Sequence, residues 1–201
     1  MSTFSQTMRT LTVHEVVEDR RARSAIGVVG FVLATAFGAQ IAVQLPWTPV
    51  PVTLQPLLVI LAGAMLGPRL GALAMAAYVA VGALGAPVFA NGGAGLPWLL
   101  GATGGYLLAA PLAAFVTGAV ARASERASSP VAQSLGLAVA LSLGVAVMYV
   151  GGVSWMLAFT GRDAATAVAL GVTPFLVGDL TKIGLAFFIV RSSRWARRRR
   201  S

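Results

Sequence analysis

Six apolar stretches, separated by shorter connections, account for most of this chain. Several of them reach the ~18 consecutive apolar residues that are typical of a transmembrane helix. One stretch is short, spanning only ~20 Å by helical rise, so we expect a neighbouring loop to cover part of it. The pattern predicts an all-α, polytopic membrane protein with six transmembrane helices, at residues 24–45, 54–66 (the short stretch), 70–85, 104–121, 131–159 and 174–190.

Three connections alternate with the apolar stretches on one side of the predicted bundle. Residues 46–56 contain four prolines, which prevent a regular helix. Residues 86–103 are rich in glycine but otherwise apolar. A loop in water would be more polar, so we expect this one to fold over the mouth of the bundle as a lid. The third connection, residues 160–173, contains a short helix-prone run.

Composition supports the membrane class and excludes several kinds of chemistry. Of 201 residues, 57% are hydrophobic and only 10% are charged, which no ordinary soluble domain matches. Cysteine is absent, and the only histidine, His14, lies in the polar N-terminal segment. We therefore expect no catalytic residues, no metal site and no cofactor. The chain also lacks the phosphate-binding motif of ATPases, so any process that it carries out either takes its energy from a partner or runs downhill.

The formal net charge of +9 could suggest nucleic-acid binding, but the arginines are clustered at the chain ends and in short loops. Six spans place both termini on one side of the bilayer, and every arginine except Arg162 falls on that side. By the positive-inside rule this side is cytoplasmic. We therefore expect a polar cytoplasmic tail at residues 1–23, a six-helix membrane domain at 24–190 and a basic cytoplasmic tail at 191–201, with the lipid bilayer rather than nucleic acid as the surrounding partner.

Two charged residues interrupt the last apolar stretch. Asp179 and Lys182 lie near its middle, where each charge costs roughly 2.5–3.5 kcal/mol on membrane-insertion scales. At positions i and i+3 they share one face of a helix. They either form a salt bridge that holds helices together in the bundle, or they build a polar recognition site for a solute. We favour the site, because ionisable residues at membrane depth are usually functional.

The first apolar stretch carries small residues at every fourth position: Gly30, Ala34, Gly38 and Ala42. Such a ridge lets another helix approach closely. The sequence leaves open whether that helix belongs to this bundle or to a partner protein.

Several sequence fragments resemble the BioY family, the biotin-specific S components of energy-coupling-factor (ECF) vitamin importers. They are VPVTLQPL (50–57), GPRLGALAMAAYVAVGALGAPVFANGGAG (67–95), LGATGGYL (100–107) and GDLTK (178–182). Where the family often reads GPTGGYL, this chain has Ala102 in place of proline. The resemblance covers nearly the whole chain beyond the N-terminal tail, in order and spacing.

The resemblance implies an ECF S-component-like bundle in a bacterial or archaeal cytoplasmic membrane. Such a protein captures biotin from outside and docks on a transmembrane coupling subunit driven by ATP-binding subunits. Docking in the family usually uses small residues of the first helix, here the Gly30 to Ala42 ridge. The polar pocket residues of the family correspond to Asn91, Asp179 and Lys182.

The chemistry of biotin agrees with these residues. An ionised Asp179 can accept from the ureido N–H groups, Asn91 can donate or accept, and Lys182 can donate to a carbonyl or carboxylate. We expect apolar parts of the ligand to be walled by Phe89, Tyr149 and Trp155. Asn91 could instead be a turn residue, and Trp155 an interfacial anchor.

Three rival functions remain. The first is an S component for a different small vitamin, and the second is a non-transporting membrane scaffold. The third, an intramembrane enzyme, is disfavoured because Ser154 has no histidine in any span and one aspartate is too few for a metal site.

Overall fold

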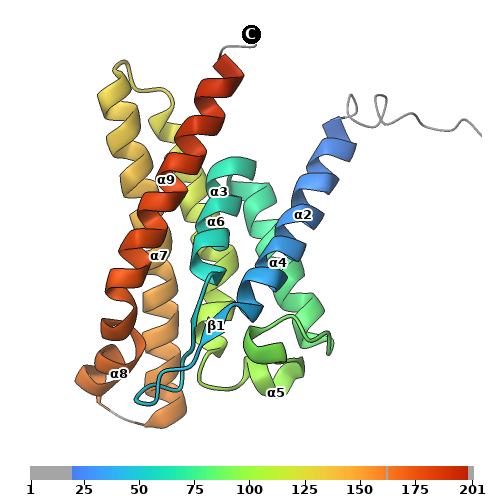
Figure 1. Cartoon of the computed structure of the whole chain (residues 1–201), viewed down its shortest axis with the longest axis vertical. Helices are drawn as coiled ribbons and strands as arrows, with labels where there is room; N and C mark the ends of the chain where they lie inside the picture. Colours follow the sequence, from blue (N-terminus) through green and yellow to red (C-terminus); the bar gives the residue numbers. More distant parts are fainter. Residues whose placement is uncertain (1–19, 162, 199–201) are drawn as a thin grey trace, which may run out of the picture.

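The computed structural model describes residues 20–161 and 163–198, most of which lie in helices. One helix occupies most of each of the six predicted spans, so the predicted all-α bundle is confirmed. By length and composition, four helical segments of the described chain can cross a membrane, and α3 and α4 are shorter apolar helices. The six helices, side by side in Figure 1, are α2 (Arg20–Gln40), α3 (Gln55–Leu66), α4 (Pro68–Ala83), α6 (Gly104–Ser124), α7 (Pro130–Thr160) and α9 (Leu176–Arg198).

The first span is shorter than predicted. Helix α2 ends at Gln40, and the next residues form a two-residue strand β1 (Ala42–Val43) that pairs with β2 (Val52–Thr53) in antiparallel register. The backbone N–H of Leu54 donates to the carbonyl of Gly38 at 3.2 Å, which satisfies a carbonyl in the last turn of α2. The prolines from Pro46 onward prevent the helix from continuing. The hydrogen bonds of the β1–β2 pair and the bond from Leu54 to Gly38 therefore take the place of further helical hydrogen bonds.

The ends of the chain also differ from the predicted domain boundaries. Helix α2 begins at Arg20, inside the segment predicted as a tail, and α9 continues past Val190 to Arg198 without a break. The rest of the predicted tails, residues 1–19 and 199–201, lies outside the described residues. The boundaries at 23/24 and 190/191 therefore mark changes in polarity, while the helices run through them.

The short elements gather at one end of the bundle. They are the β1–β2 hairpin, η1 (Ala90–Gly92), α5 (Gly95–Leu99), α8 (Ala164–Gly171) and η2 (Thr173–Phe175). The turns between α3 and α4 and between α6 and α7 lie at the opposite end, together with both ends of the described chain (Figure 1). This arrangement matches the alternation of loops that the six-span topology predicts.

Glycine allows the central helices to pack very closely. A Cβ added at Gly63 of α3 would collide with the backbone carbonyl of Ala114 in α6, and one added at Gly105 of α6 would collide with the carbonyl of Gly151 in α7. Close backbone approach at small residues is how membrane helices gain packing energy without a hydrophobic driving force. Helices α3, α6 and α7 therefore form the centre of the bundle.

The small-residue ridge of α2 divides between two environments. Gly38 is buried, and a Cβ there would overlap the side chain of Leu58 in α3. Gly30 is exposed, and no atom lies within 4 Å of a Cβ built on it. Ala34 is half-buried, and Ala42 lies in β1 beyond the end of the helix. Internal packing thus accounts for the Gly38 end of the ridge and leaves the Gly30 end open.

Candidate functional site

A cavity opens among the short elements at the loop end of the bundle. Its volume is about 60 Å³. Two of the three predicted connections, residues 46–56 and 86–103, contribute to its lining, together with η2 and helices α6, α7 and α9. The lining residues are Val50, Pro51, Thr53, Gln55, Pro56, Ala90, Trp98, Thr103, Tyr106, Leu107, Val145, Met148, Tyr149, Phe175, Asp179 and Lys182.

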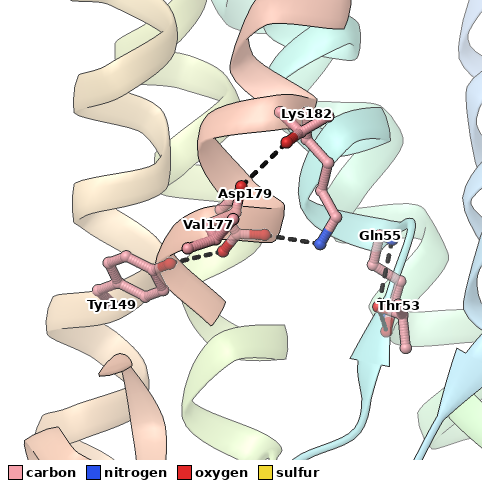
Figure 2. Close-up of polar contacts among 7 residues, drawn as sticks. Thr53, Gln55, Tyr149, Val177, Asp179 and Lys182 are labelled. Carbon is pink, nitrogen blue, oxygen red and sulfur yellow. Dashed lines mark hydrogen bonds and ion pairs between the residues drawn. The ribbon is translucent and has the colours of Figure 1, made fainter. Parts of the chain in front are cut away.

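Asp179 is the centre of the polar wall of this cavity. Its residue is only 4% exposed, and its two carboxylate oxygens accept hydrogen bonds from different helices. Lys182 Nζ donates to Oδ1 at 2.6 Å, and the hydroxyl of Tyr149 on α7 donates to Oδ2 at 2.6 Å. Figure 2 shows these two donors on opposite sides of the carboxylate. The i and i+3 spacing therefore produces the predicted ion pair, and α7 adds a third member.

The local sequence explains the position of Asp179. Pro174 lies in η2, and α9 begins directly afterwards, which places Asp179 in its first turn. The N–H groups and the dipole at a helix N-terminus favour negative charge there. The helix end, the ammonium of Lys182 and the hydroxyl of Tyr149 thus all direct hydrogen-bond donors or positive charge at this carboxylate.

Lys182 keeps hydrogen-bonding capacity beyond this pair. Its residue is 8% exposed, and Asp179 is the one hydrogen-bond partner of its ammonium among the described residues. An ammonium has three N–H donors. Two donors therefore remain available at the wall of the cavity, for water or for a ligand oxygen.

A second set of hydrogen bonds lies on the side of the cavity that the β1–β2 hairpin forms. Thr53 Oγ1 lies 3.2 Å from Gln55 Oε1, and Gln55 Nε2 donates to the hydroxyl of Tyr78 at 2.8 Å. That hydroxyl donates in turn to the carbonyl of Val88 at 2.9 Å. These bonds connect the hairpin with the start of residues 86–103, which we call the lid segment. Figure 2 shows Thr53 and Gln55 beside Lys182.

The remaining walls are aromatic and apolar. Trp98 of α5, Tyr106 of α6 and Phe175 of η2 each contribute a ring. The hydroxyl of Tyr106 donates to the carbonyl of Gly171 at 2.6 Å, which fixes the orientation of that ring. A mostly apolar cavity with a few placed polar groups is typical of sites for small molecules.

The comparison with known families decides the affiliation. The family model described as "BioY family" matches residues 7–199, nearly the whole sequence. This chain belongs to the BioY family. The resemblance found in the sequence fragments is therefore confirmed.

The relatives give the same affiliation, and one solved structure has the same fold. The chain is 42% identical over 159 residues to a probable biotin transporter BioY of Pyrococcus horikoshii, covering 79% of this chain and 88% of that protein. It is 39% identical over 147 residues to the biotin transporter BioY of Thermotoga maritima, covering 73% and 82%. Its fold resembles the crystal structure of the S-component for biotin from an ECF-type ABC transporter, with TM-score 0.80, 23% identity, and coverage of 88% of this chain and 93% of that one. The ECF S-component-like fold is therefore confirmed, and this BioY-family chain is a multi-pass membrane protein.

The structure places three of the predicted site residues of this BioY-family chain on the cavity wall: Tyr149, Asp179 and Lys182. Their contact with a ligand stays a prediction.

The other three lie around the cavity rather than on its wall. Asn91 is exposed and adopts a left-handed conformation with φ 55°, the geometry of a turn residue, while its neighbour Ala90 faces the cavity. Phe89 is fully buried edge-on against Tyr78, with ring centroids 5.7 Å apart. Trp155 donates its indole N–H to the carbonyl of Gly101 at 2.9 Å. In this conformation these side chains shape the loops, and ligand contact by any of them requires a rearrangement.

The sequence did not identify all of the cavity lining. Trp98, Tyr106, Phe175 and Met148 were not singled out, because aromatic and methionine residues are equally common in membrane-facing positions. Trp98 did carry a weak signal, since it lies in the connection at residues 86–103, where an apolar ring needs something to cover it.

Proposed function

We propose that this BioY-family protein is the biotin-binding membrane subunit of a vitamin uptake transporter. In this proposal it captures biotin from outside and passes it inward together with an ATP-driven coupling module. The observation that carries it is the buried Asp179, held by Tyr149 and Lys182 on the wall of an otherwise apolar cavity. Family membership and the names of the relatives support biotin as the ligand.

The polar wall suits a ligand with both donors and a carbonyl or carboxylate. Lys182 donates its two remaining N–H groups to a biotin oxygen, in a charge-assisted bond. Asp179 accepts from the ureido N–H groups when the ligand takes the place of one of its present donors. The thioether ring and the valeryl chain lie against Trp98 and Phe175. Asn91, Phe89 and Trp155 belong to the site in this proposal if the loops close around the ligand.

Ligand entry requires the walls to move. The cavity volume of about 60 Å³ is smaller than a bicyclic ligand with a five-carbon chain. The segment around the β1–β2 hairpin contributes Val50, Pro51 and Thr53 to the lining, and the segment before α5 contributes Ala90. Both segments lie at the same end of the bundle (Figure 1). Binding therefore includes a rearrangement of these loops, as is common where a ligand becomes enclosed.

The energising partners follow from the same proposal. A transmembrane coupling subunit docks on the exposed part of α2 around Gly30 and Ala34, and ATP-binding subunits drive it. The protein lies in the cytoplasmic membrane of a bacterium or archaeon. Its arginine-rich end, where both ends of the described chain lie, faces the cytoplasm by the positive-inside rule. The cavity at the other end of the bundle therefore faces outward.

Ligand binding by the purified protein tests the proposal. Titration with biotin, thiamine and riboflavin in detergent should give saturable binding of biotin alone. A preference for thiamine or riboflavin would assign the protein to another vitamin. Absence of binding by folded protein to all three would favour the scaffold function.

A further inference from the structure

A second hollow surface lies between α7 and α9, at the end of the bundle opposite the cavity (Figure 1). Three adjoining hollows share Arg191, and we call them together the α7–α9 groove. Its polar part is lined by Ser134 of α7 with Arg191, Arg194 and Trp195 of α9. No carboxylate lines any of the three hollows, although the neighbouring Glu125 pairs with Arg194 at 2.8 Å. The groove therefore carries a net positive charge.

Arg191 is positioned by contacts with both helices. Its Nη1 donates to the hydroxyl of Ser134 at 2.9 Å, and its guanidinium lies 5.8 Å from the ring centre of Phe187. A guanidinium has five N–H donors in a fixed fork that matches the oxygens of a phosphate. The bond to Ser134 uses one of these donors and keeps the side chain at the groove.

An apolar strip continues from this polar part along the same two helices. Val131 and Leu135, one helical turn apart on α7, are 68% and 63% exposed, and Phe188 of α9 is 68% exposed. The first two line the hollow next to Arg191, and Phe188 lines the third hollow. The groove thus offers a cation directly beside exposed hydrocarbon.

We propose that the α7–α9 groove binds one anionic glycerophospholipid. Its phosphate accepts from Arg191, and its acyl chains cover the strip of Val131, Leu135 and Phe188. Basic pockets between transmembrane helices bind acidic lipid head groups, and tryptophan such as Trp195 is favoured at the head-group level. A free phosphate would leave the hydrocarbon strip uncovered, which is why the observations favour a lipid. The proposal is independent of biotin binding, since the groove lies at the other end of the bundle.

Lipid titration followed by native mass spectrometry tests the proposal. Delipidated protein in detergent is titrated with palmitoyl-oleoyl phosphatidylglycerol or with the corresponding phosphatidylcholine. We expect the protein to bind one phosphatidylglycerol molecule tightly and to bind phosphatidylcholine more weakly. Arg191→Gln should weaken the first phosphatidylglycerol about fivefold, the effect of one basic residue near a membrane surface. Arg69→Gln is the matched control, because Arg69 is an exposed arginine at the same end, on α4 and outside the groove.

The outcomes separate the possible occupants. Equal losses in the two variants, or equal affinity for both lipids, would overturn the proposal in favour of unspecific charge. A dimer peak that Arg191→Gln abolishes would assign the groove to a second copy of the chain. Binding of glycerol phosphate as tight as that of the lipid would assign it to a soluble anion. Ser134→Ala, which leaves the charge in place, should give a smaller loss than Arg191→Gln while the melting temperature stays unchanged.

Discussion

Replacing Asp179 by asparagine is the most informative change in the cavity. The substitution keeps the shape of the side chain and removes its charge. The amide can still accept on one side, but its NH₂ group faces either Tyr149 or Lys182, each of which donates to the carboxylate at 2.6 Å. One donor therefore loses its partner, and the ligand loses an ionised acceptor.

The expected loss of affinity follows from the strength of such bonds. A hydrogen bond to a charged group contributes about 1.5–3 kcal/mol net, and each 1.4 kcal/mol is tenfold in affinity. Asp179→Asn should therefore weaken biotin binding by about 10- to 100-fold. Breaking a fully buried ion pair costs about 3–5 kcal/mol of stability, and we expect less here because Lys182 borders the cavity.

Calorimetric titration with biotin, together with a thermal unfolding curve, measures both effects. Asp163→Asn is the control, because Asp163 is exposed on the N-cap of α8 and asparagine caps equally well. The double variant Asp179→Asn with Lys182→Met removes the unpaired charge, so it should recover stability without recovering affinity.

Two results would refute this reasoning. If Asp179→Asn binds biotin within twofold of the parent, then Asp179 is not part of the site. If the double variant is fully stable and also binds like the parent, then the pair has no role in recognition and the biotin site lies elsewhere.

Three further substitutions test the structure around the site. Gly63→Ala should destabilise the protein by about 1–3 kcal/mol in denaturant unfolding, because the new methyl group meets the carbonyl of Ala114, whereas Gly184→Ala, with no atom nearby, should not destabilise it. Gln40→Ala should accelerate biotin release in a chase experiment, because Gln40 makes two bonds to the lid segment before α5, at 3.0 Å each; an unchanged release rate would show that these bonds do not hold the lid. Asp163→Ala should lower the melting temperature only above about pH 4. The backbone N–H of Thr166 in the first turn of α8 lowers the pKa of the Asp163 carboxyl below its ordinary 3.8. The contribution of this carboxylate to stability is therefore present above that value and is lost as the pH falls through the lowered pKa. A difference that persists equally at pH 2 and pH 7 would contradict a charged cap.

Much of the fold could be read from the order of residues. The apolar lengths predict the six helices, because a helix satisfies its own backbone in a bilayer and needs no distant partner. The i and i+3 spacing likewise predicts the contact of Asp179 with Lys182, since helix geometry alone brings them together. The sequence fragments also indicated the family correctly.

Features that depend on contacts between distant segments were not accessible in this way. Tyr149 and Asp179 are 30 residues apart in sequence. They meet only because α7 and α9 pack with the turns that carry these residues side by side. The ridge of α2 divides because α3 covers Gly38 and not Gly30, and no periodicity in α2 carries that information. The exposed left-handed turn at Asn91 depends on how its loop folds back.

The sequence by itself determined that the chain spans a membrane and that an acid and a base pair in its last apolar stretch, because the length of an apolar run and helical spacing are local properties of the chain. Only the tertiary structure decided which rings and amides surround that pair and which faces stay open. Those depend on which segments pack against one another, and packing couples every helix to its neighbours at once.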